Sequence, residues 1–292
     1  MLVGCQDAAM ELRPSHTAQV GASEVRRALP QRGRRTVGAW CFADHFGPVE
    51  ADDGMQIGPH PHIGLQTVTW LVEGGLLHRD SLGSEQPIRP GQLNLMTAGH
   101  GIAHAEESLW KDQVDTTHGI QLWVAQPDTT RNGAPAFEHH GDLPTVEVGF
   151  VEATVLIGAL EGVHSPARHD TPLLGAELRA FRGETTLELD RSFEHAVVVL
   201  DGSVVLEDDD AEVAPGLLAY LEPGRDELTI AVEDDARLML LGGPPFEAEP
   251  YMRWNFVGRT RDEVVAAAAE WNAGDERFGP VSSALPRIPA PD

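Results

Sequence analysis

The stretch Thr67-Val68-Thr69-Trp70-Leu71-Val72, closed by the turn residues Glu73-Gly74-Gly75, shows the pattern that decides the fold of this chain. Runs rich in β-branched and aromatic residues that end in Gly, Pro, Asn or Asp are typical of β-strands. Because many short strands in succession favour a sandwich, barrel or jelly roll, we expect an all-β fold. Comparable runs lie at residues 119–124, 146–151, 196–200, 204–206, 217–221, 228–232 and 238–241.

The chain length and a short internal repeat both predict two domains. A chain of 292 residues is about twice the roughly 150 residues of a common domain. Residues 71–74 and 199–202 each read as the end of a strand and a turn, and each is followed by Pro-Gly at the start of another strand. This repeated pattern indicates one β-domain that occurs twice in the chain. Since Gly, Pro and polar residues gather between Pro135 and Pro144, we expect domains at residues 1–138 and 139–292.

One short helix is expected near the C-terminus, at about residues 260–273, within the second domain. Thr260-Arg261-Asp262-Glu263 forms a capping box, in which a hydroxyl and a carboxylate each accept a hydrogen bond from a free amide of the first turn. An Ala-rich run follows, and Gly274 is a typical stop. The segment 287–291 is expected to be a loose tail.

The charge balance disfavours one class of partner. There are 21 Lys and Arg residues against 46 Asp and Glu residues, which gives a net charge of −25. Neutralising nucleic-acid phosphates needs a basic patch, so direct nucleic-acid binding is disfavoured.

No apolar run is long enough for a transmembrane helix. We therefore expect no membrane partner.

Cysteine usage favours a reducing compartment. Cys5 and Cys41 provide neither a disulfide framework nor the spacing of a thiolate metal site. The segment Leu2-Val3-Gly4-Cys5 superficially resembles a lipoprotein cleavage box, but no basic region and no apolar stretch precede it. The expected location is the cytoplasm.

Histidines carry the chemical signal, and ten of the 13 lie before residue 150. His60 and His62 share one face of a strand, because side chains two residues apart point the same way. His104 and Glu106 have the same period. Two such pairs on adjacent strands can place three imidazoles and one carboxylate around a single ion. That ligand set suits iron, copper, nickel, manganese or zinc and disfavours calcium and magnesium.

The other candidates have plainer interpretations. Trp70, Trp123 and Phe46 either line a pocket or belong to the core. The acidic run 207–210 is expected to be a charged hairpin tip. Four histidines are expected in loops, and a fifth is expected to be structural or at the surface: His139, His140, His164 and His169, and then His195.

The segment that contains His60 and His62 and the segment that contains His104 and Glu106 resemble the two metal motifs of the cupin superfamily. Gly54 precedes His60, and Gly101-Ile102-Ala103 precedes His104. The chain departs from the motifs at Gln66, where the first has Glu, and at Gly99, where the second has Pro. A narrower resemblance, over roughly residues 30 to 126, is to the pirin family. It rests on the segments 32–35, 42–48, 60–64, 78–83, 88–91 and 96–106, and more loosely on 242–245, Trp254-Asn255-Phe256 and 277–279.

The resemblance implies a bicupin, with two jelly-roll domains and one metal in the N-terminal domain. The ligands carried over from the family pattern are His60, His62, His104 and Glu106. Gln66 is outside that ligand set, so it is not expected to abolish metal binding. His100 stands where the family usually has Arg, and two alternatives stay open: it contacts a ligand, or it is a loop residue facing water.

The resemblance also implies a function. Bacterial pirins resemble quercetin 2,3-dioxygenase, which opens the central ring of a flavonol with O2 and releases carbon monoxide. The implied cofactor is one Fe(II) per chain, with other divalent transition metals possible, and the implied substrates are a small aromatic enediol and O2. Glu106 would act both as a ligand and as the general base.

Two alternatives to this function stay open. In one, the chain is a non-enzymatic, redox-sensing iron protein that modulates a transcription factor or a metabolic enzyme. In the other, the metal serves only to stabilise the fold.

Overall fold

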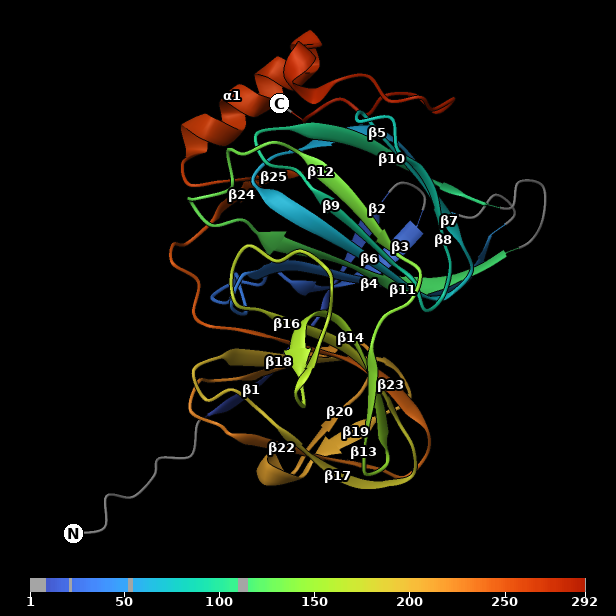
Figure 1. Cartoon of the computed structure of the whole chain (residues 1–292), viewed down its shortest axis with the longest axis vertical. Helices are drawn as coiled ribbons and strands as arrows, with labels where there is room; N and C mark the ends of the chain where they lie inside the picture. Colours follow the sequence, from blue (N-terminus) through green and yellow to red (C-terminus); the bar gives the residue numbers. More distant parts are fainter. Residues whose placement is uncertain (1–8, 21–22, 52–54, 110–114, 292) are drawn as a thin grey trace. The chain divides into compact units, whose positions relative to one another are not determined.

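The computed structural model describes residues 9–20, 23–51, 55–109 and 115–291, and it confirms the all-β prediction (Figure 1). Strands dominate the described residues, and one α-helix lies near the C-terminus. Cys5, with the segment 2–5, and Gly54 lie outside the described residues. The chain divides into two compact units, which are described separately below.

Within the described ranges, no helix combines the length and the apolar character that crossing a membrane requires.

The first unit comprises residues 17–35, 41–142 and 247–292, and it contains two sheets. Its core draws apolar side chains from both of them, including Val25, Phe46, Ile57 and Leu76. The larger sheet has the order β12 (Ala136–His140), β9 (Leu93–Thr97), β6 (Leu65–Glu73), β11 (Asp115–Ala125), β4 (Trp40–Ala51), β3 (Ser23–Leu29) and β2 (His16–Val20). The smaller sheet has the order β5 (Gln56–His62), β10 (Ile102–Ser108), β7 (Leu76–Asp80) and β8 (Glu85–Ile88).

The second unit comprises residues 36–40 and 143–246 with the N-terminal segment to His16, and it also contains two sheets around an aliphatic core. One sheet has the order β1 (Met10–Pro14), β21 (Leu217–Leu221), β18 (Glu194–Asp201), β23 (Ala236–Gly243), β16 (Leu174–Ala180), β14 (Val151–Leu160) and β13 (Thr145–Val148), with β15 (Val163–His164) on β14. The other has the order β17 (Gly183–Glu188), β22 (Glu227–Val232), β19 (Val204–Leu206) and β20 (Ala211–Val213). The single strand expected at 146–151 is split, because the chain turns between β13 and β14.

The predicted helix is confirmed as α1 (Arg261–Ala273). The Thr260 hydroxyl accepts a hydrogen bond from the Glu263 amide, and the Glu263 carboxylate accepts one from the Thr260 amide. At the other end, Gly274 adopts a φ of 77°, which costs a glycine little because it has no Cβ.

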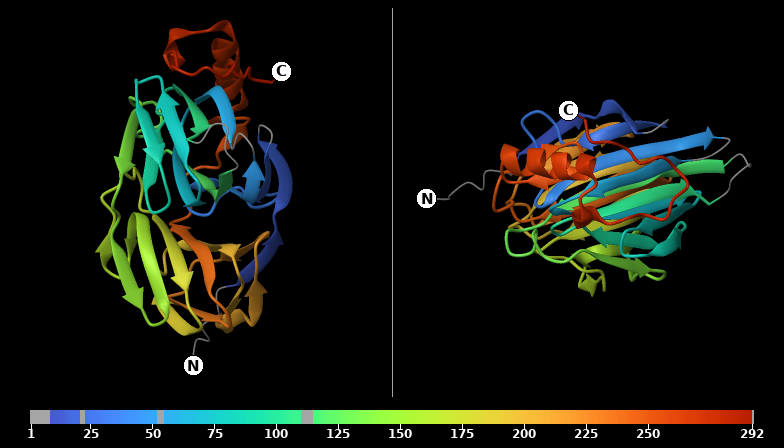
Figure 2. Two further views of the ribbon diagram at one scale, coloured as in Figure 1. Left: turned by 90° about the vertical axis from the view of Figure 1, so that its right-hand side faces the viewer. Right: turned by 90° about the horizontal axis from the view of Figure 1, so that it is seen from above.

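The helix is expected in the second domain, but it packs within the first unit. Its buried face joins a core cluster that contains Ile63, Ala103 and Phe256. Beside α1 lies the hairpin of β24 (Tyr251–Arg253) and β25 (Phe256–Gly258) (Figures 1 and 2). The exact limit between residues 138 and 139 stays a prediction.

The C-terminal tail is docked and not loose. The Trp271 indole donates a hydrogen bond to the Ile288 carbonyl at 2.8 Å, and the Ile288 amide donates one to the Pro59 carbonyl at 2.9 Å. Ala290 is only 5% exposed. The tail is therefore part of the first unit and reaches the strand that carries His60.

His195 is a buried structural histidine of the second unit. It lies on β18 with an exposed fraction of 0%, and neither ring nitrogen has a hydrogen-bond partner among the described residues. Burial lowers the pKa of His195 to about 4, although the charge of Asp190 acts in the opposite direction. The folded state therefore holds this imidazole neutral.

This burial predicts a pH dependence of stability. As the pH falls from about 6.5 to about 4, the unfolded chain gains a proton at His195 that the folded chain does not take up, so stability falls. By this linkage, His195→Leu is expected to remove a pH-dependent loss of about 2 kcal/mol at about pH 5. Urea unfolding at a series of pH values measures it, and the difference at alkaline pH reports the change in packing alone. A variant whose stability falls with pH as steeply as that of the wild type would contradict the prediction.

Candidate metal centre

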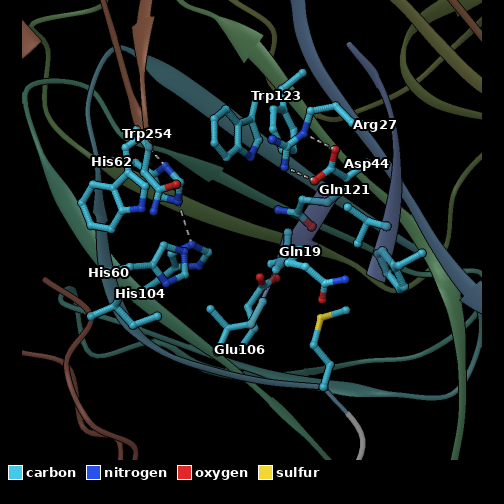
Figure 3. Close-up of a pocket in the computed structure, with 18 of the residues that line it drawn as sticks. Gln19, Arg27, Asp44, His60, His62, His104, Glu106, Gln121, Trp123 and Trp254 are labelled. Carbon is cyan, nitrogen blue, oxygen red and sulfur yellow. Dashed lines mark hydrogen bonds and ion pairs between the residues drawn. The ribbon is translucent and has the colours of Figure 1, made fainter. Parts of the chain in front are cut away.

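Three histidines of the first unit converge on one point (Figure 3). His60 and His62 come from β5 and His104 comes from β10, and their ligand atoms all lie within 4.8 Å of one another. The side chains are 6%, 1% and 1% exposed respectively. This is the group of imidazoles that the sequence spacing predicts.

The pairing of two strands explains the convergence. β5 and β10 are antiparallel, and His104 lies directly opposite His60 in their register. His62 shares the face of His60, since side chains alternate along a strand. The register shifts between His104 and Glu106, where β5 carries an extra residue next to Gly58. Gly58 admits a close approach of the tail, because a Cβ there would lie 2.1 Å from the Pro286 carbonyl oxygen.

Hydrogen bonds set the tautomers of the two histidines on β5. His60 Nδ1 lies 2.9 Å from the Gly58 carbonyl oxygen, and His62 Nδ1 lies 3.0 Å from that of Asn255. A carbonyl oxygen only accepts, so both Nδ1 atoms donate and both Nε2 atoms keep a lone pair. His62 Nε2 lies 3.0 Å from His104 Nε2, in the middle of the group. Lone pairs that converge in this way fit a divalent cation.

Burial keeps the imidazoles neutral. It lowers the pKa of His60 to about 4, and it lowers the pKa values of His62 and His104 well below the usual value, with repulsion from neighbouring imidazoles adding to the effect. A metal binds the neutral imidazole, so the ligands need not lose protons at neutral pH.

Glu106 lies next to this group, two residues along β10 from His104, and it lines the same cavity (Figure 3). Its carboxylate accepts a hydrogen bond from the Thr69 hydroxyl at 3.4 Å. Burial raises the pKa of Glu106. The tight group within 4.8 Å consists of the three histidines, so the role of Glu106 as a ligand stays a prediction.

A cavity of about 300 Å³ opens onto the histidines. One wall is aromatic: Phe42 stacks on Trp123 with ring centroids 3.9 Å apart, and Trp123 meets His62 edge-on at 5.2 Å. Trp123 and Phe46 line the cavity as one of the two interpretations predicted, whereas Trp70 is buried in the larger sheet and is not among the lining residues. The pocket is thus shaped for flat, apolar groups.

The opposite end of the cavity is polar. Arg27 and Asp44 form a two-point ion pair with N···O distances of 2.7 and 2.6 Å, so their charges cancel locally. The amide of Gln121 lies beside this ion pair, and that of Gln19 lies between it and Glu106 (Figure 3). This end can exchange hydrogen bonds with polar substituents of a ligand.

Sequence reasoning missed the contribution of the C-terminal segment. Trp254 and Ile288 line the cavity, and the Asn255 carbonyl orients His62. Trp254 has a φ of 50°, a value that non-glycine residues rarely adopt. The sequence signal for this segment was the Trp254-Asn255-Phe256 motif, which does not indicate that these residues reach the cavity.

Gln66 and His100 take no part in the group. Gln66 is fully buried and donates to the Thr97 hydroxyl at 3.0 Å. His100 is exposed in a loop, with Nδ1 3.0 Å from the Gly133 carbonyl oxygen, so the water-facing alternative is the one found. His139 and His140 lie on β12 and not in a loop, because β12 pairs with β9 there.

Comparison with known proteins bears on both units. The pirin family model matches residues 22–124, and the model of the pirin C-terminal cupin domain matches residues 177–279. A Pseudomonas aeruginosa protein, whose name gives quercetin 2,3-dioxygenase as a provisional activity, is 49% identical over 282 residues, which cover 95% of this chain and 88% of that protein. A pirin-like protein of Caulobacter vibrioides is 36% identical over 264 residues, covering 87% of this chain and 90% of its own length.

A solved structure agrees with these relatives. The crystal structure of a quercetin 2,3-dioxygenase from Acinetobacter baumannii matches with a TM-score of 0.93 and 43% identity, and the match covers 97% of this chain and 95% of that one. The similarity extends over both units, which are therefore two cupin domains. The chain belongs to the pirin family.

Proposed function

We propose that this pirin is an iron-dependent dioxygenase that cleaves a flavonol, or a similar aromatic enediol, with O2 and releases carbon monoxide. One observation carries the proposal: three buried, neutral imidazoles open onto a cavity with an aromatic wall. The names of the Pseudomonas and Acinetobacter relatives support the same activity. In the overall reaction both atoms of O2 enter the organic product, while one ring carbon leaves as carbon monoxide.

His60, His62 and His104 would hold the Fe(II), and Glu106 would complete the set. One carboxylate against Fe(II) leaves a charge of about +1, which a buried site tolerates better than +2. Bound iron would supply open coordination positions and one-electron chemistry for O2 and a substrate oxygen. The same ligands suit copper, nickel and manganese, so the native metal is part of the proposal.

Glu106 is the candidate general base. Its carboxylate lies in the cavity, and burial raises its pKa, which favours uptake of a proton from a substrate hydroxyl. The same space is lined by the apolar side chains Val25, Met55, Ile57 and Leu76, which offer water no hydrogen bonds. The amides of Gln19 and Gln121 would bond phenolic hydroxyls at the far end.

The alternative is the redox-sensing interaction protein. It uses the same metal site but requires no turnover, so an activity measurement separates the two functions. The cytoplasmic location, too, stays a proposal.

The function is tested by turnover. Fe(II)-reconstituted protein is expected to remove the flavonol absorbance band of quercetin only when O2 is present, with one carbon monoxide trapped per flavonol consumed. Spectrophotometry combined with trapping of the gas measures both quantities. Absence of turnover at full iron occupancy would contradict the proposal and favour the interaction protein.

The ligand assignment is tested by His62→Ala. This variant is expected to lose metal affinity by more than about 100-fold, since even neighbours of ligands cost 10–100-fold. The fold is expected to persist, because the cores of both units are apolar and need no metal. Metal content and circular dichroism are the measurements, with the exposed His100→Ala as the matched control. A His62→Ala protein that is unfolded would refute the expectation.

Trp254 offers a test of substrate contact. A non-glycine residue in this backbone region costs about 1–2 kcal/mol, so Trp254→Gly relieves strain while it removes an indole from the cavity. We expect the KM for the flavonol to rise by about 10-fold, which is worth about 1.4 kcal/mol. The melting temperature should stay within a few degrees, and Trp254→Phe should retain most of the affinity. An unchanged KM in the glycine variant would show that the indole does not touch substrate.

A further inference from the structure

A chain of buried side chains extends from the metal centre to the turn between β7 and β8. His104 Nδ1 lies 3.4 Å from His78 Nδ1, and His78 Nε2 lies 3.1 Å from Asp80 Oδ2. His78 and Asp80 are 4% and 3% exposed. Strand pairing creates the chain, because β7 lies next to β10 with Asp80 opposite His104 and His78 opposite Glu106.

Asp80 is anchored at the far end of this chain. Its Oδ1 atom accepts hydrogen bonds from two backbone amides of the turn, Leu82 at 2.9 Å and Ser84 at 3.0 Å. Oδ2 is therefore the oxygen left to face His78. The His78 ring is held in its plane by Phe137, which stacks on it with centroids 4.3 Å apart and an interplanar angle of 12°.

In the neutral form of His78, these contacts determine where each proton lies. An Asp carboxylate can only accept, so His78 Nε2 carries the hydrogen of the neutral ring and His78 Nδ1 keeps its lone pair. That lone pair can only accept, so His104 Nδ1 must carry a hydrogen. His104 Nε2, the atom that faces His62, is then left with a lone pair, which is the form a metal binds.

His104 differs in this respect from the other two histidines. His60 and His62 donate to backbone carbonyls, which no substitution of a side chain removes. The acceptor of His104 belongs to a side chain, and the orientation of that side chain depends on a second one. The Nε2 atoms of His62 and His104 lie 3.0 Å apart. Their lone pairs repel each other unless a cation binds both.

We propose that His78 and Asp80 are positioning residues that fix the tautomer of His104 and thereby prepare it to bind the metal. The proposal rests on the metal-binding part of the proposed function and not on the identity of the substrate. Neighbours of this kind raise the basicity of a ligand and typically account for 10–100-fold in metal affinity.

The decisive variant is Asp80→Asn, which is nearly isosteric. The two turn amides hold the Oδ1 position, so the new amide group would face His78 as a donor. His78 would then carry its hydrogen on Nδ1, and His104 would carry its hydrogen on Nε2, where the metal should bind. We expect the affinity for Co(II) to fall by about 10–100-fold.

Two readouts are needed. Titration with Co(II), followed by its visible absorption bands, measures the affinity. Nitrogen NMR of the histidines in metal-free protein identifies the tautomer of His104 with no metal and no substrate present. Asp170→Asn is the matched control, because it removes a buried carboxylate from an ion pair with Arg168 in the other unit. It is expected to leave both readouts unchanged.

A second pair of variants guards against a folding defect in the turn. His78→Asn places an amide oxygen at the position of Nδ1, where it can accept from His104, whereas His78→Leu offers no acceptor. We expect the asparagine variant to keep the wild-type tautomer of His104 and most of the Co(II) affinity, and the leucine variant to lose both. If His78 had a merely structural role, the Co(II) affinity would fall equally in the two variants.

The outcomes separate this proposal from the proposed function. Wild-type Co(II) affinity in Asp80→Asn, or a His104 tautomer that is the same in all variants, would overturn the positioning role. A tautomer that switches in Asp80→Asn supports it even if the wild-type protein turns over no flavonol. Failure of flavonol cleavage alone therefore counts only against the proposed reaction.

Discussion

The antiparallel pairing of β5 with β10 is the constraint on which the rest of the site depends. It sets His104 opposite His60, and a slip of one residue would turn the side chains of one strand to the other face. The pairing is supported from outside β5, because the Ile288 amide bonds to the Pro59 carbonyl and the tail approaches Gly58 closely. The smaller sheet thus carries the three histidines that could hold a metal, while the larger sheet supplies the aromatic wall of the cavity.

Burial and hydrogen bonding then give these residues their chemistry. Imidazoles removed from water stay neutral, and each acceptor on an Nδ1 atom leaves the matching Nε2 atom free. Of the carboxylates that line the cavity, that of Glu106 lies next to the histidines, whereas that of Asp44 is paired with Arg27. A divalent cation would compensate this carboxylate and separate the lone pairs of His62 and His104.

Several features were predictable because they depend on local periods. The spacing of two residues in His60-Pro61-His62 places both imidazoles on one face, and the capping box specifies where α1 begins. Other features were not. From its place in the sequence α1 is expected in the second domain, yet the helix packs beside Ile63, and β1 pairs with β21 of the second unit. Local pattern shows which face of an element is apolar, but it does not show which element covers that face.

The sequence by itself determined the all-β class, the helix and its cap, and the histidines that share a strand face, because each of these follows from residue types a few positions apart. The tertiary structure alone decided which strands are neighbours. It brought His78 and Asp80 behind His104, and it brought Asn255 behind His62. These partners come from strands and turns whose separation along the chain carries no period, so only the pairing of the sheets and the docking of the C-terminal segment could select them.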